Sequence, residues 1–155
     1  MKKLAIGLMS GTSLDGIDIV LVEISGVSLE TKIRIIKEKT YPFNQEIIKK
    51  IKDAMDDQLS SSKLICSLNV ELGYVFGEAV LSFYNEENID YKDISFIASH
   101  GQTIYHIPKD QDTYLRSSLQ LGDGSIISEL TKTTVISNFR LADIASGGQG
   151  APLVP

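Results

Sequence analysis

Several features that would define a protein class are scarce or missing in this sequence. Its 155 residues include one cysteine, which excludes an intramolecular disulfide and any zinc site built on several thiolates. The 15 Lys and Arg residues are outnumbered by 20 Asp and Glu residues, giving a net charge of -5. Because binding to a phosphate backbone requires clustered basic side chains, this balance argues against nucleic acid as a partner.

Long apolar runs are also missing, and we expect no segment long enough to span a bilayer. The stretch Leu4–Met9 follows two lysines, as the core of a signal peptide would. It is too short for that role and runs directly into Ser10-Gly11-Thr12, so we interpret it as a strand. These observations predict a soluble, cytoplasmic protein without a membrane partner.

The lone cysteine, Cys66, lies among the apolar residues Leu64, Ile65 and Leu68. This setting favours a buried structural thiol over a nucleophile. The composition as a whole, 43% apolar and 23% charged, is that of an ordinary globular domain. A chain of this length is sufficient for one domain with a hydrophobic core.

The first third of the chain has strand periodicity and the next part has helix periodicity. Short β-rich runs at 4–9, 17–24 and 31–41 are separated by turns, which predicts hairpins. From Asn44 the apolar residues recur at helical spacing, and Ser60–Ser62 offer the N-cap of a second helix. Its apolar stripe consists of Leu64, Leu68, Leu72, Val75, Ala79 and Phe83. Gly73 and Gly77 inside it favour a close approach of another backbone over merely tolerated glycines.

The second half alternates short strands with one further helix. We expect strands at 94–98, 103–107, 115–121 and 134–137, a helix at 123–130 capped by Ser125 or Asp123, and an aperiodic tail at 138–155. Three antiparallel strands followed by βα crossovers predict an α/β fold with a mixed sheet. This is the arrangement of a ribonuclease H-like lobe, of the kind that is paired in actin-like ATPases.

The most informative segment is Gly7–Asp18, where a turn rich in small polar residues joins two strands. Gly11 and Gly16 let the backbone turn with its N–H groups exposed, and Thr12 and Ser13 add hydroxyl donors. Asp15 and Asp18 could bind Mg²⁺ beside a phosphate. No Gly-Lys-[Ser/Thr] is present, so this is not a Walker A loop. From composition alone, an ordinary polar turn remains the alternative.

Two further segments follow predicted strands and therefore point to a ligand site. In Ser99–Ile104, Gln102 and Thr103 could bond sugar hydroxyls. His100 either orients a ligand or is satisfied by loop carbonyls, while a metal site with His106 is disfavoured.

The second of these segments is Asn138–Asp143. There Arg140 could bind a carboxylate or phosphate, and Asp143 is either a base or an ion-pair partner of Arg140. The following Gly147–Leu153 permits close backbone approach to a ligand or forms a flexible tail.

Together these motifs resemble the anhydro-N-acetylmuramic acid kinase family, a group of ATP-dependent sugar kinases of peptidoglycan recycling. The resemblance rests on Met9–Asp18, His100–Thr103, Leu121–Gly124, Arg140–Asp143 and Gly147–Leu153, in that order along the whole chain. It implies ATP contacts at Gly11, Thr12, Ser13, Leu14, Asp15, Gly16, Ile17 and Asp18, and a sugar pocket near Gln102, Thr103, Arg140 and Asp143. Mg²⁺ is implied as the second cofactor, at Asp15 and Asp18.

The family's reaction opens the 1,6-anhydro bridge of anhydro-N-acetylmuramic acid with water and phosphorylates O6. The resemblance places the catalytic base, an aspartate, in an Asp-Thr-Gly-Pro segment of a second lobe. No Asp-Thr-Gly occurs here, so this base is expected beyond Pro155, and no residue of the present chain is assigned a catalytic role.

We therefore expect residues 1–155 to form the N-terminal lobe only, inactive alone, with an apolar surface toward the second lobe. A homodimer is implied for the full-length protein. The alternatives are a non-catalytic sugar- or phosphate-binding module and one subunit of a split kinase.

Overall fold

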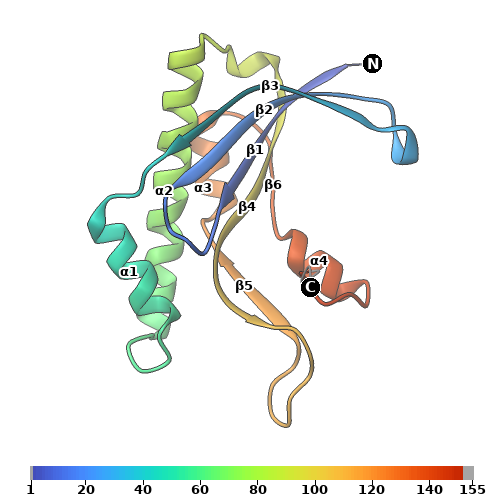
Figure 1. Cartoon of the computed structure of the whole chain (residues 1–155). Helices are drawn as coiled ribbons and strands as arrows, with labels where there is room; N and C mark the ends of the chain where they lie inside the picture. Colours follow the sequence, from blue (N-terminus) through green and yellow to red (C-terminus); the bar gives the residue numbers. More distant parts are fainter. Residues whose placement is uncertain (1, 152–155) are drawn as a thin grey trace.

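A mixed β-sheet with its first three helices packed on one face forms the structure, a computed structural model that describes residues 2–151 (Figure 1). The strands are β1 (Lys3–Ser10), β2 (Ile17–Ser25), β3 (Lys32–Tyr41), β4 (Ile94–Ile107), β5 (Ser117–Leu121) and β6 (Val135–Ile136). The helices are α1 (Gln45–Met55), α2 (Ser62–Glu87), α3 (Gly124–Thr131) and α4 (Phe139–Ala145), with 3-10 turns at Ser28–Glu30 and Tyr91–Asp93.

The sheet has the strand order β3-β2-β1-β4-β5, and β6 pairs with β4. The pairs β1–β2 and β2–β3 are antiparallel, whereas β4 runs parallel to β1 and to β6. The return strand β5 is antiparallel to β4. The prediction of three antiparallel strands followed by parallel crossovers is confirmed, and the fold is that of an actin-like ATPase lobe.

Strand β4 differs most from the expectation. The sequence suggested a strand ending at Ala98 and a separate one at 103–107, but β4 is continuous over 14 residues. Its first half pairs with β1 and β6, and its second half forms a projecting hairpin with β5 (Figure 1). The segment at 99–102 is therefore strand, kinked at Gly101, and the predicted loop there is wrong. Gly101 has a φ of +73°, which allows the kink.

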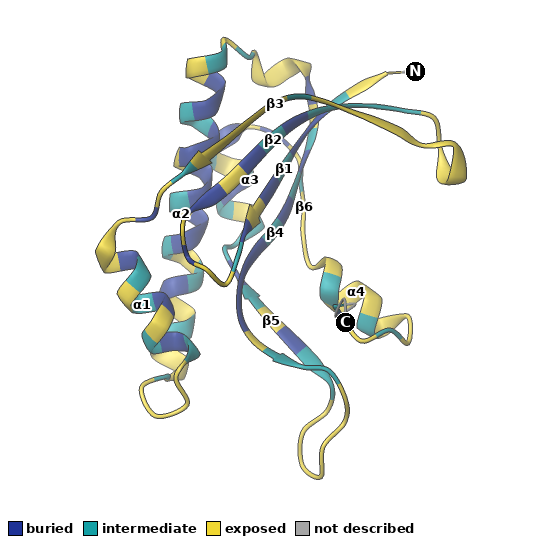
Figure 2. Ribbon diagram, viewed as in Figure 1, coloured by how far each residue is buried: buried dark blue, intermediate teal, exposed yellow. Residues whose placement is uncertain are grey.

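The hydrophobic core lies between the sheet and α1, α2 and α3. Alternate residues of β1 and β2 point into it, among them Ile6 and Ile19. Helix α2 supplies the opposing stripe, which consists of Leu68, Leu72, Phe76, Val80 and Phe83, each at most 1% exposed. Figure 2 shows this buried side of α2 turned toward the strands.

Two glycines let α3 approach α2 closely, as predicted. A Cβ atom on Gly77 would lie 2.5 Å from Leu130 Cδ1, and one on Gly73 would lie 3.1 Å from the Asp123 carbonyl oxygen. Both are shorter than a normal carbon contact. A larger residue at either position would therefore push α3 away from α2.

The expectation that no segment is long enough to cross a membrane is wrong for α2. The helix has 26 residues, and its most apolar 18-residue window has a mean hydropathy of 1.4. In the structure its apolar stripe is buried against the sheet. A helix that packs in a hydrophobic core can be as long and as apolar as a membrane-spanning helix.

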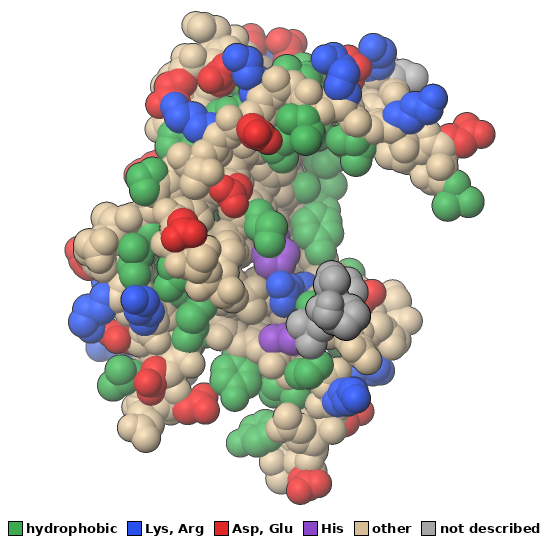
Figure 3. Space-filling model, in the orientation of Figure 1, with side chains coloured by type: hydrophobic (Ala, Val, Ile, Leu, Met, Phe, Trp, Pro, Cys, Tyr) green, Lys and Arg blue, Asp and Glu red, His purple; other side chains and the backbone are tan. Residues whose placement is uncertain are grey.

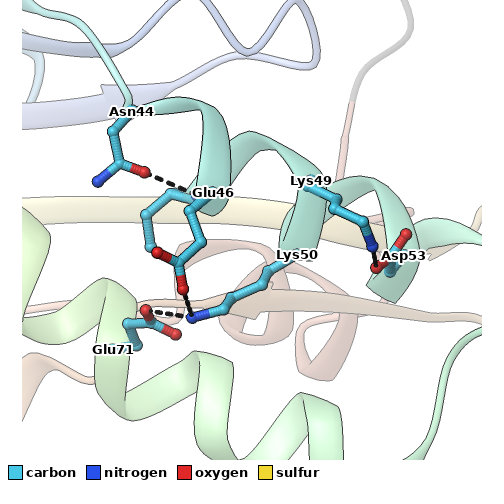
Figure 4. Close-up of polar contacts among 7 residues, drawn as sticks. Asn44, Glu46, Lys49, Lys50, Asp53 and Glu71 are labelled. Atoms are coloured by element: carbon cyan, nitrogen blue, oxygen red, sulfur yellow. Dashed lines mark hydrogen bonds and ion pairs between the residues drawn. The ribbon is translucent and has the colours of Figure 1, made fainter.

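Figure 4 shows the side chains that cap the N-terminus of α1 and connect this helix to α2. Asn44 caps the helix, because its Oδ1 accepts a hydrogen bond from the Ile47 amide at 2.8 Å. Lys50 binds Glu46 of the same helix and Glu71 of α2, both at 2.8 Å. The hydrogen bond to Glu46, followed by that to Glu71, raises the pKa of Lys50. Lys50 therefore links α1 to α2 across the surface.

The other face of the sheet is open and partly apolar. Met9, Ile33, Ile35 and Phe139 are 53%, 65%, 60% and 45% exposed. In Figure 3 hydrophobic side chains gather around a hollow in which histidine is visible. An exposed apolar surface of this kind was expected from the sequence.

The carboxylate of Glu86 leads to a pH-dependent prediction. It accepts hydrogen bonds from Lys39 Nζ (2.5 Å) and Tyr41 Oη (2.6 Å), which join α2 to β3. The bond from Lys39, and next that from Tyr41, lowers the pKa of Glu86 below its usual 4.5. Its stabilising contribution is therefore present above about pH 4.5 and is lost as the pH falls through the folded-state pKa.

Between pH 6 and pH 3, we expect the free energy of unfolding to fall less for Glu86→Gln than for the wild type. Urea unfolding of the 155-residue chain at several pH values measures this difference. Glu78→Gln, an exposed position on the same helix, is the matched control and should follow the wild-type curve. Parallel curves for Glu86→Gln and wild type would contradict the prediction.

Candidate functional site

Three segments that are distant in sequence meet at one edge of the sheet. Strands β1, β4 and β6 are mutually parallel, so their carboxyl ends point the same way. Ser10 at the end of β1 is the register partner of Gln102, and Asn138 follows β6. Ligands of open α/β sheets bind at this edge. The loop after β1 and the segment after β6 therefore flank β4 on its two sides.

The loop between β1 and β2 is anchored by two apolar residues and exposes its polar ones. Leu14 and Ile17 are buried at 6% and 2% exposure, whereas Thr12, Ser13 and Asp15 are exposed. Leu14 has a φ of +59° and its amide donates to the Gly11 carbonyl at 3.3 Å, which closes a tight turn. Leu14 and Ile17 therefore present only backbone groups to a ligand.

Gly16 closes this loop against the end of β3. A Cβ atom on Gly16 would lie 2.9 Å from the Tyr41 carbonyl carbon, closer than side chains are found. Gly11 has no comparable neighbour, and its nearest contact would be Ser13 Oγ at 3.5 Å. Gly16 is thus required for packing the hairpin, while Gly11 leaves the loop open to a ligand.

Asp18 stands at the start of β2 and borders the groove on the open face of the sheet. Its Oδ1 accepts a hydrogen bond from Thr40 Oγ1 at 2.6 Å, which orients the carboxylate. Within the described residues no cluster of three or more His, Cys, Asp or Glu side chains could hold a metal. Mg²⁺ beside a phosphate needs only one or two carboxylates, with waters and phosphate oxygens completing its shell. Asp15 and Asp18 are both exposed, as carboxylates in such a site must be.

Gln102 does not have the exposed side chain that a direct sugar contact requires. It is 0% exposed; its Oε1 accepts from Ser10 Oγ at 2.5 Å, and its Nε2 donates to the Thr103 carbonyl at 3.1 Å. Thr103 is also buried, at 9% exposure. The reason is the continuation of β4, which places these residues between β1 and β5 instead of in a loop. Gln102 joins the end of β1 to β4 beneath the loop.

His100 is bonded at both ring nitrogens. Nδ1 lies 2.9 Å from the Gly101 carbonyl oxygen, and Nε2 accepts from Arg140 Nε at 2.9 Å. The interpretation that a carbonyl satisfies the ring is thus confirmed, with an arginine partner that the sequence did not suggest. His106 lies apart from it, and both its ring nitrogens are buried without a hydrogen-bond partner in the described part of the chain.

The segment after β6 is ordered into α4, which the aperiodic tail did not predict. Arg140 and Asp143 lie on this helix, but they do not form the ion pair that was considered. Asp143 Oδ2 instead accepts from the Gly150 amide at 2.8 Å, and its carbonyl accepts from the Gly148 amide at 2.8 Å. The glycine-rich segment is therefore folded back onto α4.

Two predictions concern the C-terminal end of the chain. The sequence predicts a glycine-rich motif that extends to Leu153, and the family resemblance implies a catalytic base beyond Pro155. Leu153 and Pro155 both fall in 152–155, outside the residues that the structure describes. The end of the motif and the place of the base therefore stay predictions.

Comparison with known proteins identifies the family. The sequence profile described as anhydro-N-acetylmuramic acid kinase matches residues 3–155. The chain belongs to the anhydro-N-acetylmuramic acid kinase family. It is 49% identical over 153 residues to the protein of that name from Francisella tularensis subsp. novicida (strain U112), covering 99% of this chain and 40% of that protein.

Other relatives agree with this result. The anhydro-N-acetylmuramic acid kinase of Clostridioides difficile (strain 630) is 50% identical over 97% of this chain and 39% of its own length. That of Bacillus cereus (strain Q1) is 49% identical over 96% of this chain and 39% of its own. The chain thus spans about two fifths of the length of the curated relatives it matches.

This member of the kinase family has a second hollow at the same edge of the sheet. It lies on the face of the sheet that α2 covers. Cys66 and Asn69 of α2, Ser99 and the Gly122–Gly124 turn line it. Cys66 is exposed there, so the prediction of a buried thiol is wrong. It borders this hollow together with strand residues, among them Ser99 of β4 and Leu119 of β5. Parts of three segments singled out in the sequence line the hollow, namely Ser99–Gly101, Leu121–Gly124 and Asn138.

Asn69 is the residue that sequence reasoning missed. Its Oδ1 accepts from the Gly122 amide at 3.0 Å and its Nδ2 donates to Asp123 Oδ2 at 3.4 Å. The only available hint was an amide side chain beside the apolar stripe of α2. Asn69 thereby holds the turn that carries the N-cap of α3, Asp123.

Gly148→Ala tests the fold of the glycine-rich segment in this family member. A Cβ atom at Gly148 would collide with the Asp143 carboxylate, so we expect the loop 147–150 to detach from α4. Hydrogen exchange of the Gly150 amide should then accelerate at least about tenfold, because its bond to Asp143 is lost. Gly147→Ala is the control for a neighbouring glycine: its Cβ would meet no atom within 4 Å, although its φ of +95° disfavours alanine. Unchanged exchange in Gly148→Ala would contradict the loop geometry.

Proposed function

We propose that the complete gene product is an ATP-dependent kinase that converts 1,6-anhydro-N-acetylmuramic acid to N-acetylmuramic acid 6-phosphate in cytoplasmic cell-wall recycling. The observation that carries this proposal is the exposed Gly11–Gly16 loop at the carboxyl ends of parallel strands, in a chain of this kinase family. Residues 1–155 would form its N-terminal lobe. The complete protein would act as a homodimer.

In this proposal the loop after β1 binds the phosphates of ATP. Its backbone N–H groups that are free of internal bonds and the hydroxyls of the exposed Thr12 and Ser13 would donate to phosphate oxygens. Asp15 and Asp18 would hold Mg²⁺, which neutralises charge on the transferred phosphoryl group when bound. Leu14 and Ile17 keep the loop in place from the core side.

The sugar would lie on the other side of β4, near Arg140 and the strand end at His100–Thr103. Gln102 and Thr103 are buried, so their contribution would be to hold β4 against its neighbours. Asp143 is engaged by the Gly150 amide and would likewise act as a structural residue. The base that activates water would come from the second lobe, beyond Pro155, together with the adenosine pocket.

A coupled ADP-release assay tests this function with anhydro-N-acetylmuramic acid, ATP and Mg²⁺. We expect turnover by the complete gene product and none by the 155-residue chain. Turnover by the short chain would overturn the assignment of the base to a second lobe. Sugar binding without turnover in either protein would instead support a non-catalytic binding module. Turnover that appears only on adding a second chain would indicate a split kinase.

A further inference from the structure

The side chain of Arg140 is held by a histidine whose hydrogen-bond partners assign its tautomer. A carbonyl oxygen can only accept, so the 2.9 Å contact between Gly101 O and His100 Nδ1 places the ring proton on Nδ1. Nε2 is then an acceptor, which agrees with the 2.9 Å bond donated by Arg140 Nε. The imidazole is thus fixed at both ends, by its own strand and by α4.

This arrangement leaves the far end of the guanidinium for another partner. His100 Nε2 accepts the hydrogen bond from Arg140 Nε. Within residues 2–151, no acceptor bonds the two terminal amino groups of Arg140. The side chain is half-buried at the edge of the sheet, so its charge is partly shielded from water. Two parallel N–H donors of a planar fork match the two oxygens of a carboxylate.

The sheet topology favours the sugar over the nucleotide as the source of this anion. Residues Ile97 and Ala98 pair with β1 and also with β6, so β1 and β6 lie on opposite sides of β4. The phosphate loop follows β1, whereas Arg140 follows β6. The proposed substrate is itself an acid, because muramic acid carries a lactyl ether carboxylate that the parent amino sugar lacks.

We propose that His100 is a positioning residue that holds Arg140 ready to bind the carboxylate of the anhydrosugar. This inference rests on the proposed function, and it assigns the choice between acidic and neutral anhydrosugars to the His100–Arg140 pair. Without His100, the guanidinium would lose its fixed orientation and would have to be ordered by the ligand, at a cost in affinity.

The test compares two sugars that differ in the lactyl group. Calorimetry on the complete gene product measures the Kd of 1,6-anhydro-N-acetylmuramic acid and of 1,6-anhydro-N-acetylglucosamine. We expect His100→Ala to weaken binding of the acid about tenfold and to leave the neutral sugar unchanged, as for loss of a charge-assisted contact. His100→Gln, whose Oε1 can accept from Arg140 Nε, should restore most of the preference. Arg140→Ala removes the guanidinium altogether and so measures its full contribution to the preference for the acid.

A second readout examines the pair without any ligand. Nitrogen-15 NMR of the imidazole ring should show the Nδ1–H tautomer in the wild type. The Nε2–H tautomer would overturn the inference, as would an equal loss of affinity for both sugars or failure of the wild type to bind either. A raised Kd for ATP in place of the acid would overturn it too, by assigning Arg140 to a phosphate. A preserved acid preference in a protein without turnover would refute the proposed function alone.

Discussion

Asp18→Asn in the complete gene product is expected to lower kcat about 100-fold or more. The substitution keeps the shape of the side chain and the acceptor for Thr40 Oγ1, but removes the negative charge. If Asp18 holds Mg²⁺ directly or through water, the charge stabilisation of the transferred phosphoryl group is lost with it. The Mg²⁺ concentration for half-maximal activity should rise in parallel. Steady-state kinetics across a Mg²⁺ titration measure both quantities.

Two variants make this result specific. Glu38→Gln removes a carboxylate that borders the same groove from the neighbouring strand, and we expect a small effect. Thr40→Val removes the hydrogen bond that orients Asp18 and keeps the charge, so its effect should lie between the two. Wild-type turnover and Mg²⁺ dependence in Asp18→Asn would refute the role of this aspartate.

The largest effect on stability is expected for Phe76→Ala. Phe76 is 1% exposed, its ring centroid lies 6.4 Å from that of Phe43, and Gly122 packs against its edge. Truncation removes a buried ring and leaves a cavity between α2, the segment before α1 and the turn before α3. The free energy of unfolding should fall by about 3–5 kcal/mol. Urea unfolding of the 155-residue chain measures this loss.

Tyr74→Ala is the matched control for this prediction. It truncates an aromatic residue two positions away on the same helix, but its side chain is 49% exposed. We expect a loss below about 1 kcal/mol, because little buried surface disappears. Similar losses for the two variants would mean that α2 is not packed as the structure has it.

The elements with local chemical signals were predictable. Asn44, Ser61 and Asp123 cap their helices with side-chain oxygens, and each lies at or within two residues of a boundary expected from the sequence. The β1–β2 hairpin was evident because alternating apolar runs flank a turn of small polar residues. The close approach of α3 at Gly73 and Gly77 was also correct, since glycine inside a helix is costly without such a reason.

The site was harder to predict because its contacts join distant segments. Sequence reasoning placed Gln102 in a loop, where an amide would face a ligand. Pairing with β1 and β5 carries β4 past Gly101 and buries that amide against Ser10. Likewise, the spacing of Arg140 and Asp143 suggested a local pair, whereas their partners are His100, 40 residues away, and the Gly150 amide. No pattern within a short window contains such partners.

The sequence by itself determined the family through its motifs, and the β1–β2 hairpin and the starts of α1, α2 and α3 through local signals. Those features depend on residue types within a few positions of one another, where turn chemistry, capping and periodicity act. Only the tertiary structure decided that Cys66 is exposed, that Gln102 is buried and that His100 orients Arg140. Burial and hydrogen-bond partners are set when β4 packs between β1 and β6, because each strand edge is satisfied by whichever neighbour the fold brings to it.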